Sequence, residues 1–276
     1  MPLFSVITTC RNAGGSIAKT ILSVLEQDFR DFEYIIMDGC SSDDTCKVAD
    51  SYKDAFAHAG IPYMIFSEED HGIYEGMNHA LKHASGDYVN FMNADDCFMG
   101  PHTLTDAARA VKEALSDGKG KPGVFYGDSV AVEFNQTYRY TKDISLIESR
   151  MPFSHQSVFA SRELLNEYPF NESYKIGADY DFLLNAYKNG HRFYDLSIQV
   201  CKVTLDGLSS VDLYNTFIET TRIQEDHGIH HYSDRQYAKK LRSLRLKQFV
   251  MDHFPKVVIM LIRKLQRIHR GQNEHC

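Results

Sequence analysis

The sequence predicts an α/β fold in which a mostly parallel sheet carries helices on both faces. The first hundred residues alternate short apolar runs with longer segments whose apolar residues recur at helical spacing. Strands that are separated by helices pair in parallel, and the helices then cover both faces of the sheet. The second half of the chain has further strands in a less regular order, and a helical stretch ends the chain.

The strands of the first half are expected at four runs, 3–10, 32–38, 62–67 and 87–92. The first run is apolar and β-branched, which is typical of a buried strand. Two helices between these strands are indicated by apolar residues that share one helical face: Ile17, Ile21, Val24 and Leu25 in the first, and Ile73, Met77, Ala80, Leu81 and Ala84 in the second. Another helix is expected from the turn at 39–45 to about residue 59.

The elements beyond residue 100 are less regular. A helix is expected near residue 103, and strands are expected at 123–132, 137–142, 154–161 and 193–204. The stretch "GADYDFLLNAYKNG" predicts a helix that Gly190 ends, because glycine adopts the left-handed conformation of a helix C-terminus without strain. We expect one α/β domain at 1–210, with halves of about 1–100 and 101–210, and a helical extension at 211–276.

Composition indicates a soluble globular protein and excludes several other classes. A hydrophobic content of 43% is enough for a substantial core, and no repeat or low-complexity tract points to a solenoid. The cysteines are scattered without a CxxC pair, which argues against a zinc site. No signal peptide is visible, so we expect a reducing, cytoplasmic location. The six cysteines are Cys10, Cys40, Cys46, Cys97, Cys201 and Cys276.

The C-terminal end of the chain is basic, whereas the rest is acidic. Residues 235–276 hold 11 Lys and Arg against two acids. Such a segment fits a helix on an anionic membrane surface, and the alternative is a helix that packs on the domain with its basic face in water. The apolar run Val257–Ile262 is far too short to span a bilayer. No nucleic-acid motif accompanies the charge of 235–270, so no nucleic-acid partner is expected.

Polar features follow each of the first four predicted strands. They are Thr8–Arg11, Asp38, the loop Glu68–Gly72, and the pair Asp95–Asp96. Because ligands of parallel α/β sheets bind at the carboxyl ends of the strands, these features are expected to meet at one ligand-binding edge.

The adjacent carboxylates of Asp95 and Asp96 suit a hard divalent cation. Mg²⁺ or Mn²⁺ takes one or two carboxylates and completes its shell with phosphate oxygens and water. The alternative is an N-cap for the helix near residue 103, since Asp is a favoured cap. Asp38 can accept a hydrogen bond from a base N–H at the same edge, and Asp70 and Gly72 can approach a ligand closely.

Seven stretches of the chain resemble the motifs of family 2 glycosyltransferases of the GT-A fold. The resemblance spans residues 3–210 and implies a Rossmann-like nucleotide-diphospho-sugar transferase. The stretches are "VITTCRNAG", "IIMDGCSSDDT", "DHGIYEGMNHAL", "FMNADDCF", "HQSVF", "IGADYDFLLNAYKNG" and "LDGLSS".

The resemblance implies roles for five residues on the donor side. Thr8 and Arg11 would lie near the nucleotide, and Asp38 would bind the base. Asp70 and Asn78 would hold the base, the ribose or the donor sugar.

The resemblance also assigns the metal site. Asp95 matches the last acid of the D-x-D motif and would bind Mn²⁺ or Mg²⁺ on the donor diphosphate, with Asp96 as its support. The first acid of that motif is Asn93 here, whose amide can still hydrogen-bond a ribose hydroxyl but adds no charge.

Asp179 matches the catalytic base of the family. A base must take the proton of the acceptor hydroxyl as it attacks the anomeric carbon, and direct displacement inverts the configuration. The glutamate that usually precedes this base is Ala178 here. The alternative is that Asp179 caps the helix 180–189. His155 can hydrogen-bond a donor phosphate or line the acceptor site, or it can be a structural histidine.

These residues predict a metal-dependent, inverting glycosyltransferase of surface polysaccharide assembly. It would transfer a sugar from a nucleotide diphosphate to a saccharide acceptor, which in this family is often lipid-linked. Two alternatives remain. One is a sugar nucleotidyltransferase, whose Gly-rich phosphate loop "CRNAGGS" resembles only faintly. The other is a catalytically silent saccharide-binding or scaffold subunit, which the departures from the family pattern at Asn93 and Ala178 would support.

Overall fold

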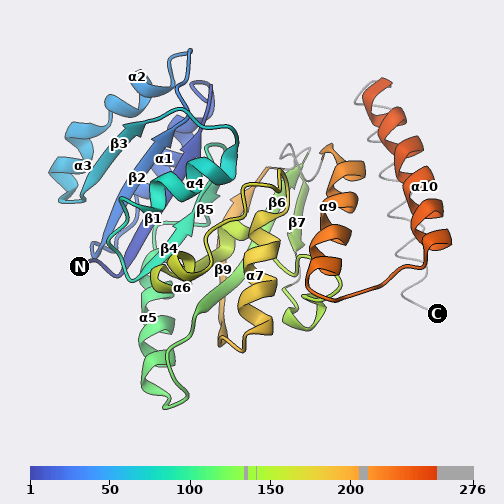
Figure 1. The fold of residues 1–276 in the computed structure, drawn as a ribbon. Helices are drawn as coiled ribbons and strands as arrows, with labels where there is room; N and C mark the ends of the chain where they lie inside the picture. Colours follow the sequence, from blue (N-terminus) through green and yellow to red (C-terminus); the bar gives the residue numbers. More distant parts are fainter. Residues whose placement is uncertain (134–135, 141, 205–210, 254–276) are drawn as a thin grey trace. The chain divides into compact units, whose positions relative to one another are not determined.

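The computed structural model describes residues 1–133, 136–140, 142–204 and 211–253 (Figure 1). Residue contacts divide the chain into two compact units, Met1–Gly207 and Leu208–Cys276. The first unit carries the sheet, and the described part of the second unit is helical. The stretch "LDGLSS" at 205–210 and the tail beyond residue 253 lie outside the described residues.

The first four strands of the sheet pair in parallel, as the sequence predicts. They lie in the order β3-β2-β1-β4, and their bounds are β1 Phe4–Cys10, β2 Phe32–Asp38, β3 Tyr63–Ser67 and β4 Tyr88–Phe91. All residues of β1, β2 and β4 are buried, which explains why these runs are almost continuously apolar. The expected α/β class is thereby confirmed.

The remaining strands make the sheet mixed. Beyond β4 the order is β8-β6-β9-β5, and β7 pairs with the C-terminal half of β6. Only β6 and β9 are parallel among these pairs of the described chain, and β8 is antiparallel to both of its neighbours. The bounds are β5 Cys97–Phe98, β6 Val124–Glu133, β7 Gln136–Tyr140, β8 Val158–Ser161 and β9 Phe193–Val203.

One face of the sheet is covered by α1 (Ile17–Leu25), α2 (Thr45–Asp50), α3 (Lys53–Ala59) and α5 (Thr103–Ser116). Their apolar residues share one core with Phe4, Val6 and Tyr34 of the strands. The single helix expected up to residue 59 is divided in two. The chain turns after α2, and α3 then brings Phe56 into a stack with Tyr63, whose ring centroid is 4.3 Å away.

The opposite face carries α4 (Ile73–Leu81), α6 (Arg162–Glu167) and α7 (Ala178–Lys188) (Figure 1). Met77 and Leu81 of α4 are buried where this helix contacts β1 and β2. Helices on both faces are therefore confirmed. The chain leaves α7 at Gly190, whose φ of 77° is the left-handed conformation expected there.

The second unit contains α9 (Leu213–Asp226) and α10 (Asp234–His253). The two helices meet through Phe217 and Tyr237, whose rings stack at 5.5 Å, and Gln248 of α10 donates a hydrogen bond to the carbonyl of Val211. Within the described chain, no helix is long and apolar enough to cross a bilayer.

Candidate active site

The carboxyl ends of the parallel strands meet at one edge of the sheet. Cys10 at the end of β1 pairs with Asp38 at the end of β2, and Asp38 pairs in turn with Ser67 at the end of β3. The chain after β4 leaves the sheet beside β1, where the N–H of Met92 bonds the carbonyl of Ile7 at 2.8 Å. The strand-end features that the sequence indicates are therefore neighbours.

Asp38 is a buried carboxylate surrounded by neutral donors. Its Oδ2 accepts hydrogen bonds from the N–H of Ser41 at 2.9 Å, from Oγ of Ser67 at 2.7 Å and from Sγ of Cys46 at 3.2 Å. Burial by itself would raise the pKa of Asp38, but these hydrogen bonds outweigh it and lower the pKa below its usual value. Asp38 therefore stays ionised and ties together the ends of β2 and β3 and the start of α2.

Asp70 packs against glycine at the same edge. A Cβ atom at Gly39 would collide with its carboxylate, and one at Gly76 would lie 3.2 Å from its Oδ2. Burial raises the pKa of Asp70, and the nearby guanidinium of Arg11 opposes this rise. Arg11 is exposed and donates a hydrogen bond to the carbonyl of Asp70 at 3.4 Å. The two side chains thus lie together where a ligand can reach them.

The acids Asp95 and Asp96 have different environments. Asp96 is 2% exposed; its Oδ1 accepts from the N–H of Thr204 at 2.8 Å, and its Oδ2 accepts from Nε2 of Gln156 at 2.6 Å. Burial, with the charge of Asp95 as a smaller cause, raises the pKa of Asp96 to about 6. Asp95 is partly exposed, and its Oδ2 accepts from Oγ1 of Thr204 at 2.6 Å. Asp95 is therefore the carboxylate of the pair that a ligand can reach.

Neither acid caps the next helix. A short strand, β5, follows them directly, and α5 begins after its N-cap residue His102. Within the described chain, no three His, Cys, Asp or Glu residues form a group that could hold a metal ion. The partly exposed carboxylate of Asp95 is an oxygen ligand, the kind that Mg²⁺ and Mn²⁺ prefer.

Asp179 lies in the first turn of α7, and three polar groups surround its carboxylate; the hydroxyl of Tyr74 is one of them, and it also lies 2.6 Å from the carbonyl of Ile176. Oδ1 of Asp179 accepts from the N–H of Tyr180 at 2.9 Å and lies 3.1 Å from the hydroxyl of Tyr74 on α4. Its Oδ2 lies 2.9 Å from Nδ1 of His155, in the short 3₁₀ helix His155–Ser157. The N-cap of α7 is Gly177, so Asp179 does not cap this helix.

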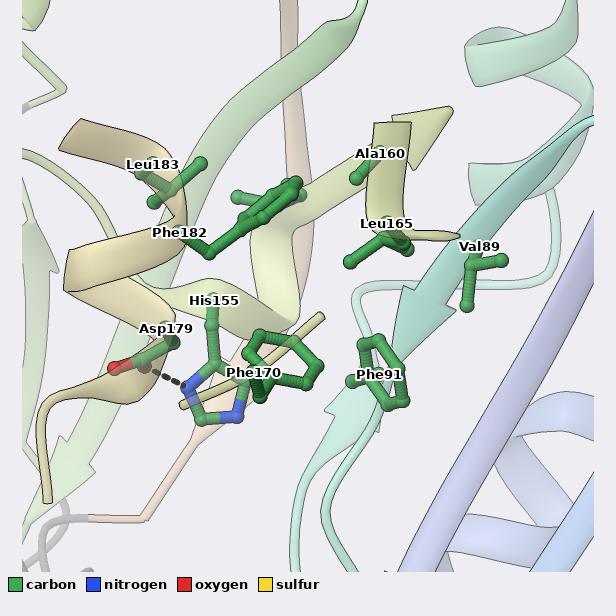
Figure 2. A pocket seen from close by; sticks show the side chains of 10 residues that line it. Val89, Phe91, His155, Ala160, Leu165, Phe170, Asp179, Phe182 and Leu183 are labelled. Atoms are coloured by element: carbon green, nitrogen blue, oxygen red, sulfur yellow. Dashed lines mark ion pairs between the residues drawn. The ribbon is translucent and has the colours of Figure 1, made fainter. Parts of the chain in front are cut away.

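A small apolar cavity lies behind His155 and Asp179. Figure 2 shows the two side chains pointing toward one another at one end of it. Its volume of about 20 Å³ is room for about one water molecule. The pair therefore has an apolar wall on this side. The other lining residues are Val89, Phe91, Val158, Ala160, Leu165, Phe170, Phe182 and Leu183.

Two of the candidate residues are engaged in the framework. Thr8 is buried, and its hydroxyl lies 2.9 Å from that of Tyr34. Asn78 makes two hydrogen bonds with the backbone of Phe170, from its Nδ2 to the carbonyl at 2.9 Å and from the N–H to its Oδ1 at 3.0 Å. The geometry thus gives both side chains partners within the protein, and Asn78 fixes the segment that leads to α7.

Three residues that contact the site were not identified from the sequence, and the role of a fourth, Thr9, was not singled out within the stretch Thr8–Arg11. Gln156 and Thr204 hold the acid pair, and Tyr74 contacts Asp179. Thr9 is buried at the ligand edge, and its Oγ1 has no hydrogen-bond partner within the described chain. Tyr74 and Gln156 lie inside two of the family-like stretches, "DHGIYEGMNHAL" and "HQSVF", so their position in these stretches could have identified them. Thr204 had no such signal, because its contact with the acids depends on the course of β9.

The chain is similar in sequence to known glycosyltransferases. Residues 5–176 match the family model "Glycosyl transferase family 2". A PGL/p-HBAD biosynthesis glycosyltransferase of Mycobacterium tuberculosis is 27% identical over 190 residues, which are 68% of this chain and 71% of that protein. The poly(ribitol-phosphate) β-N-acetylglucosaminyltransferase TarS of Staphylococcus aureus is 27% identical over 212 residues, 71% of this chain but 34% of TarS.

Solved structures agree on the fold. The crystal structure of TarS 1–349 with UDP aligns with a TM-score of 0.63 and 25% identity, covering 81% of this chain and 64% of that one. The mannosyltransferase PcManGT of Pyrobaculum calidifontis, solved with GDP-Man and Mn²⁺, aligns with a TM-score of 0.64 and 19% identity, covering 90% of this chain and 70% of that one. At 19% identity this second likeness concerns the fold alone.

These findings confirm the resemblance. The fold and the matched motifs define a GT-A-like transferase, and the chain belongs to glycosyl transferase family 2. It is a glycosyltransferase.

The raised pKa of Asp96 predicts a specific pH dependence of stability. A carboxyl whose pKa is about 6 in the folded state and roughly 4 when unfolded binds its proton more tightly in the fold. Its unfavourable contribution to the free energy of unfolding is thus complete above pH 6 and fades as the pH falls toward 4. We expect Asp96→Asn to remove this dependence, so that wild type gains up to about 3 kcal/mol relative to the variant between pH 7.5 and 4.

Urea denaturation in metal-free buffer measures this difference. Asp87→Asn, which removes an exposed carboxylate just before β4, is the matched control and should follow wild type at every pH. If the free energy of unfolding changed with pH in the same way for wild type and Asp96→Asn, the raised pKa of Asp96 would be contradicted.

Proposed function

We propose that this glycosyltransferase uses a divalent metal and inverts the anomeric configuration as it moves a sugar from a nucleotide diphosphate to a saccharide acceptor. The proposal depends mainly on the position of Asp179, whose carboxylate lies between His155 and Tyr74. The TarS crystals with UDP and UDP-GlcNAc support a nucleotide-sugar donor. The name of TarS, a poly(ribitol-phosphate) β-N-acetylglucosaminyltransferase, supports a polymer acceptor, and we extend the proposal to saccharide acceptors of surface polysaccharide assembly, lipid-linked ones included.

The donor nucleotide would bind at the carboxyl ends of β1, β2 and β3. Arg11 and Asp70 are accessible there, and Asp38 lies behind them with its charge retained. We assign the ribose or sugar hydroxyls to Asp70. Asp38, whose oxygens already have partners in the protein, would act on the nucleobase through the donors that it holds, Ser41 and Ser67. Thr8 and Asn78 would act through the framework, because their polar atoms already have partners in the protein.

Mn²⁺ or Mg²⁺ would join the donor diphosphate to Asp95. Asp95 is the accessible acid, and Asp96 supports it through their shared partner Thr204. When bound, such an ion stabilises the negative charge that develops on the departing diphosphate. Lys19 lies close by, with its ammonium 2.9 Å from the carbonyl of Asp95, and adds a positive charge at this edge.

Asp179 would act as the general base on the acceptor. Tyr180, Tyr74 and His155 surround its carboxylate, yet its two oxygens together have about four lone-pair positions, so it can still accept the acceptor hydroxyl. As that oxygen attacks the anomeric carbon from the side opposite the diphosphate, its proton passes to Asp179.

Replacing Asp179 tests this role. General bases contribute roughly 10²- to 10⁴-fold to rate, so we expect Asp179→Asn to lower kcat by that factor and to leave donor binding within a few-fold. Transfer assays report kcat, and thermal shift with the donor nucleotide reports binding. Asp181→Asn on the same helix is the matched control, because the two side chains lie about 200° apart around α7. Unchanged turnover of Asp179→Asn would remove Asp179 from the mechanism.

Metal removal tests the role of Asp95. We expect EDTA to stop transfer and Mn²⁺ to restore it, and we expect Asp95→Asn to raise the Mn²⁺ concentration for half-maximal activity at least tenfold, because it removes the accessible charged ligand. A titration of activity with Mn²⁺ measures this, with Asp87→Asn as the control. Full activity of metal-free enzyme would show that the acids have another purpose.

We also propose that α10 binds the cytoplasmic face of a membrane. Arg235, Lys239, Arg242, Leu246 and Phe249 recur at spacings of four and three residues, so they form one stripe, and all five are exposed. The residues that contact α9 and its start, including Tyr237 and Gln248, lie on the other side of the helix. Basic and apolar side chains on one face suit the headgroup region of anionic lipid.

Vesicle sedimentation tests this surface. Each basic residue adds about 1 kcal/mol of attraction to an anionic surface, so changing Arg235, Lys239 and Arg242 together to Gln should weaken binding to phosphatidylglycerol vesicles by tenfold or more. The control changes three exposed lysines of the first unit, Lys53, Lys82 and Lys112, to Gln. Equal loss in both triple variants, or equal binding to neutral vesicles, would contradict a specific surface on α10.

A further inference from the structure

The proposed base follows a stretch of chain without regular structure. Residues 168–177, between α6 and α7, form neither helix nor strand, and Asp179 comes directly after them in the first turn of α7. Such a stretch has no ladder of backbone hydrogen bonds to fix it, so its position depends on contacts with its neighbours. Helix α4 supplies such contacts at both ends of the stretch.

Asn78 of α4 holds the start of this stretch. Its Oδ1 accepts a hydrogen bond from the N–H of Phe170 at 3.0 Å, and its Nδ2 donates to the carbonyl of Phe170 at 2.9 Å and to Oε1 of Glu172 at 2.8 Å. An amide has two N–H donors and one oxygen, so both donors and the oxygen of Asn78 are engaged with the stretch. Asn78 therefore acts on the backbone that precedes the base.

Tyr74 holds the end of the stretch. It lies one turn before Asn78, at the spacing that places two side chains on one face of a helix. The side chain is buried, and its hydroxyl lies 2.6 Å from the carbonyl of Ile176 and 3.1 Å from Oδ1 of Asp179. A hydroxyl has a single proton to donate, and the carbonyl is the nearer acceptor. Tyr74 therefore fixes the backbone before α7 as well as touching the carboxylate.

The same helix holds the loop 68–72 on the donor side. Oε2 of Glu75 accepts a hydrogen bond from the N–H of His71 at 2.6 Å. A Cβ atom at Gly76 would lie 3.2 Å from Oδ2 of Asp70, so this carboxylate packs directly on α4. Helix α4 thus contacts the accessible acid of the donor side and, through Tyr74, the carboxylate of Asp179.

We propose that α4 fixes the position of the base relative to the donor loop 68–72, and that Tyr74 and Asn78 are the positioning residues through which it does so. The proposal rests on the role of Asp179 as the base. The acceptor oxygen must meet the anomeric carbon within a narrow range of distance and direction, and a misplacement of about 1 Å can lower a rate roughly a hundredfold. One helix in contact with both partners preserves that geometry.

Contacts from other elements also reach the base. Oδ2 of Asp179 lies 2.9 Å from Nδ1 of His155, and Nε2 of His155 lies 3.3 Å from Oδ1 of Asn93, on the loop after β4. These contacts do not involve the hydroxyl of Tyr74. Removal of that hydroxyl should therefore shift the carboxylate of Asp179 rather than release it, with a partial loss of rate.

Amide hydrogen exchange of the full chain measures the hold of Asn78 on the stretch. The informative amide is that of Tyr174, which bonds the carbonyl of Asn171 at 3.1 Å and is not a partner of Asn78. We expect Asn78→Ala to raise its exchange rate about tenfold or more while the amides of β2 keep their wild-type rates, because the stretch opens locally. Asn166→Ala removes an exposed amide on α6 and is the matched control, which should leave both regions unchanged.

An unchanged exchange rate at Tyr174 in Asn78→Ala, or an equal rise throughout the sheet, would overturn the proposal. This measurement does not require sugar transfer. Failure of the proposed base would appear as full turnover of Asp179→Asn, whereas failure of the hold by α4 would appear in the exchange rates.

Kinetics test the effect of Tyr74 on the base. Tyr74→Phe removes only the hydroxyl, and we expect it to lower kcat about tenfold while the donor KM stays within about threefold. In the Asp179→Asn background the same change should have no further effect on kcat, because the group that it positions is gone. Tyr63→Phe is the matched control: it removes a hydroxyl that bonds the carbonyl of Ala49 at 3.0 Å, and it should leave kcat unchanged.

Two results would contradict this role of Tyr74. An equal loss of kcat in both backgrounds would mean that the hydroxyl supports the fold in general. A raised donor KM with unchanged kcat would mean that Tyr74 serves donor binding instead.

Discussion

The register of the parallel strands determines everything else at this site. Because β1, β2 and β3 end level with one another, side chains more than 25 residues apart in sequence, such as Cys10 and Asp38, become neighbours. The same edge collects several acids, which repel one another. The protein offsets this repulsion mainly with neutral donors, as the hydroxyl and thiol groups around Asp38 show. The edge therefore stays negative, which is the condition for recruiting a cation.

The acids divide into framework and accessible groups. Asp38 and Asp96 are buried and bonded to the protein, whereas Asp95 is partly exposed. The ionised form of Asp96 is the less stable of the two buried carboxylates, because burial raises its pKa to about 6, whereas the pKa of Asp38 is lowered. A cation on Asp95 would stabilise the ionised form of Asp96, so binding of the metal and stability of the acid pair would be coupled. Asp179 differs from these three acids, because the imidazole of His155 is among its partners.

Much of the fold could be predicted, because its strands are buried on both faces and read as apolar runs. The expected strand 32–38 coincides with β2. The gathering of acids at one edge also followed from the alternation of strands and helices. The resemblance assigned Asp95 as the ligand and Asp96 as its support. The difference in burial between them could not be derived, because it depends on Gln156 and Thr204, which reach the pair from distant parts of the chain. For the same reason the partner of Asn78 could not be foreseen.

The proposed mechanism inverts the anomeric carbon, because a base that acts opposite the leaving diphosphate implies a single displacement. The donor can be chosen by thermal-shift screening of UDP-, GDP- and dTDP-sugars with Mn²⁺. The ¹H NMR coupling constant of the anomeric proton in the freshly formed product then gives its configuration. From an α-linked donor we expect a β-linked product, whereas an α-linked product would rule out a single displacement.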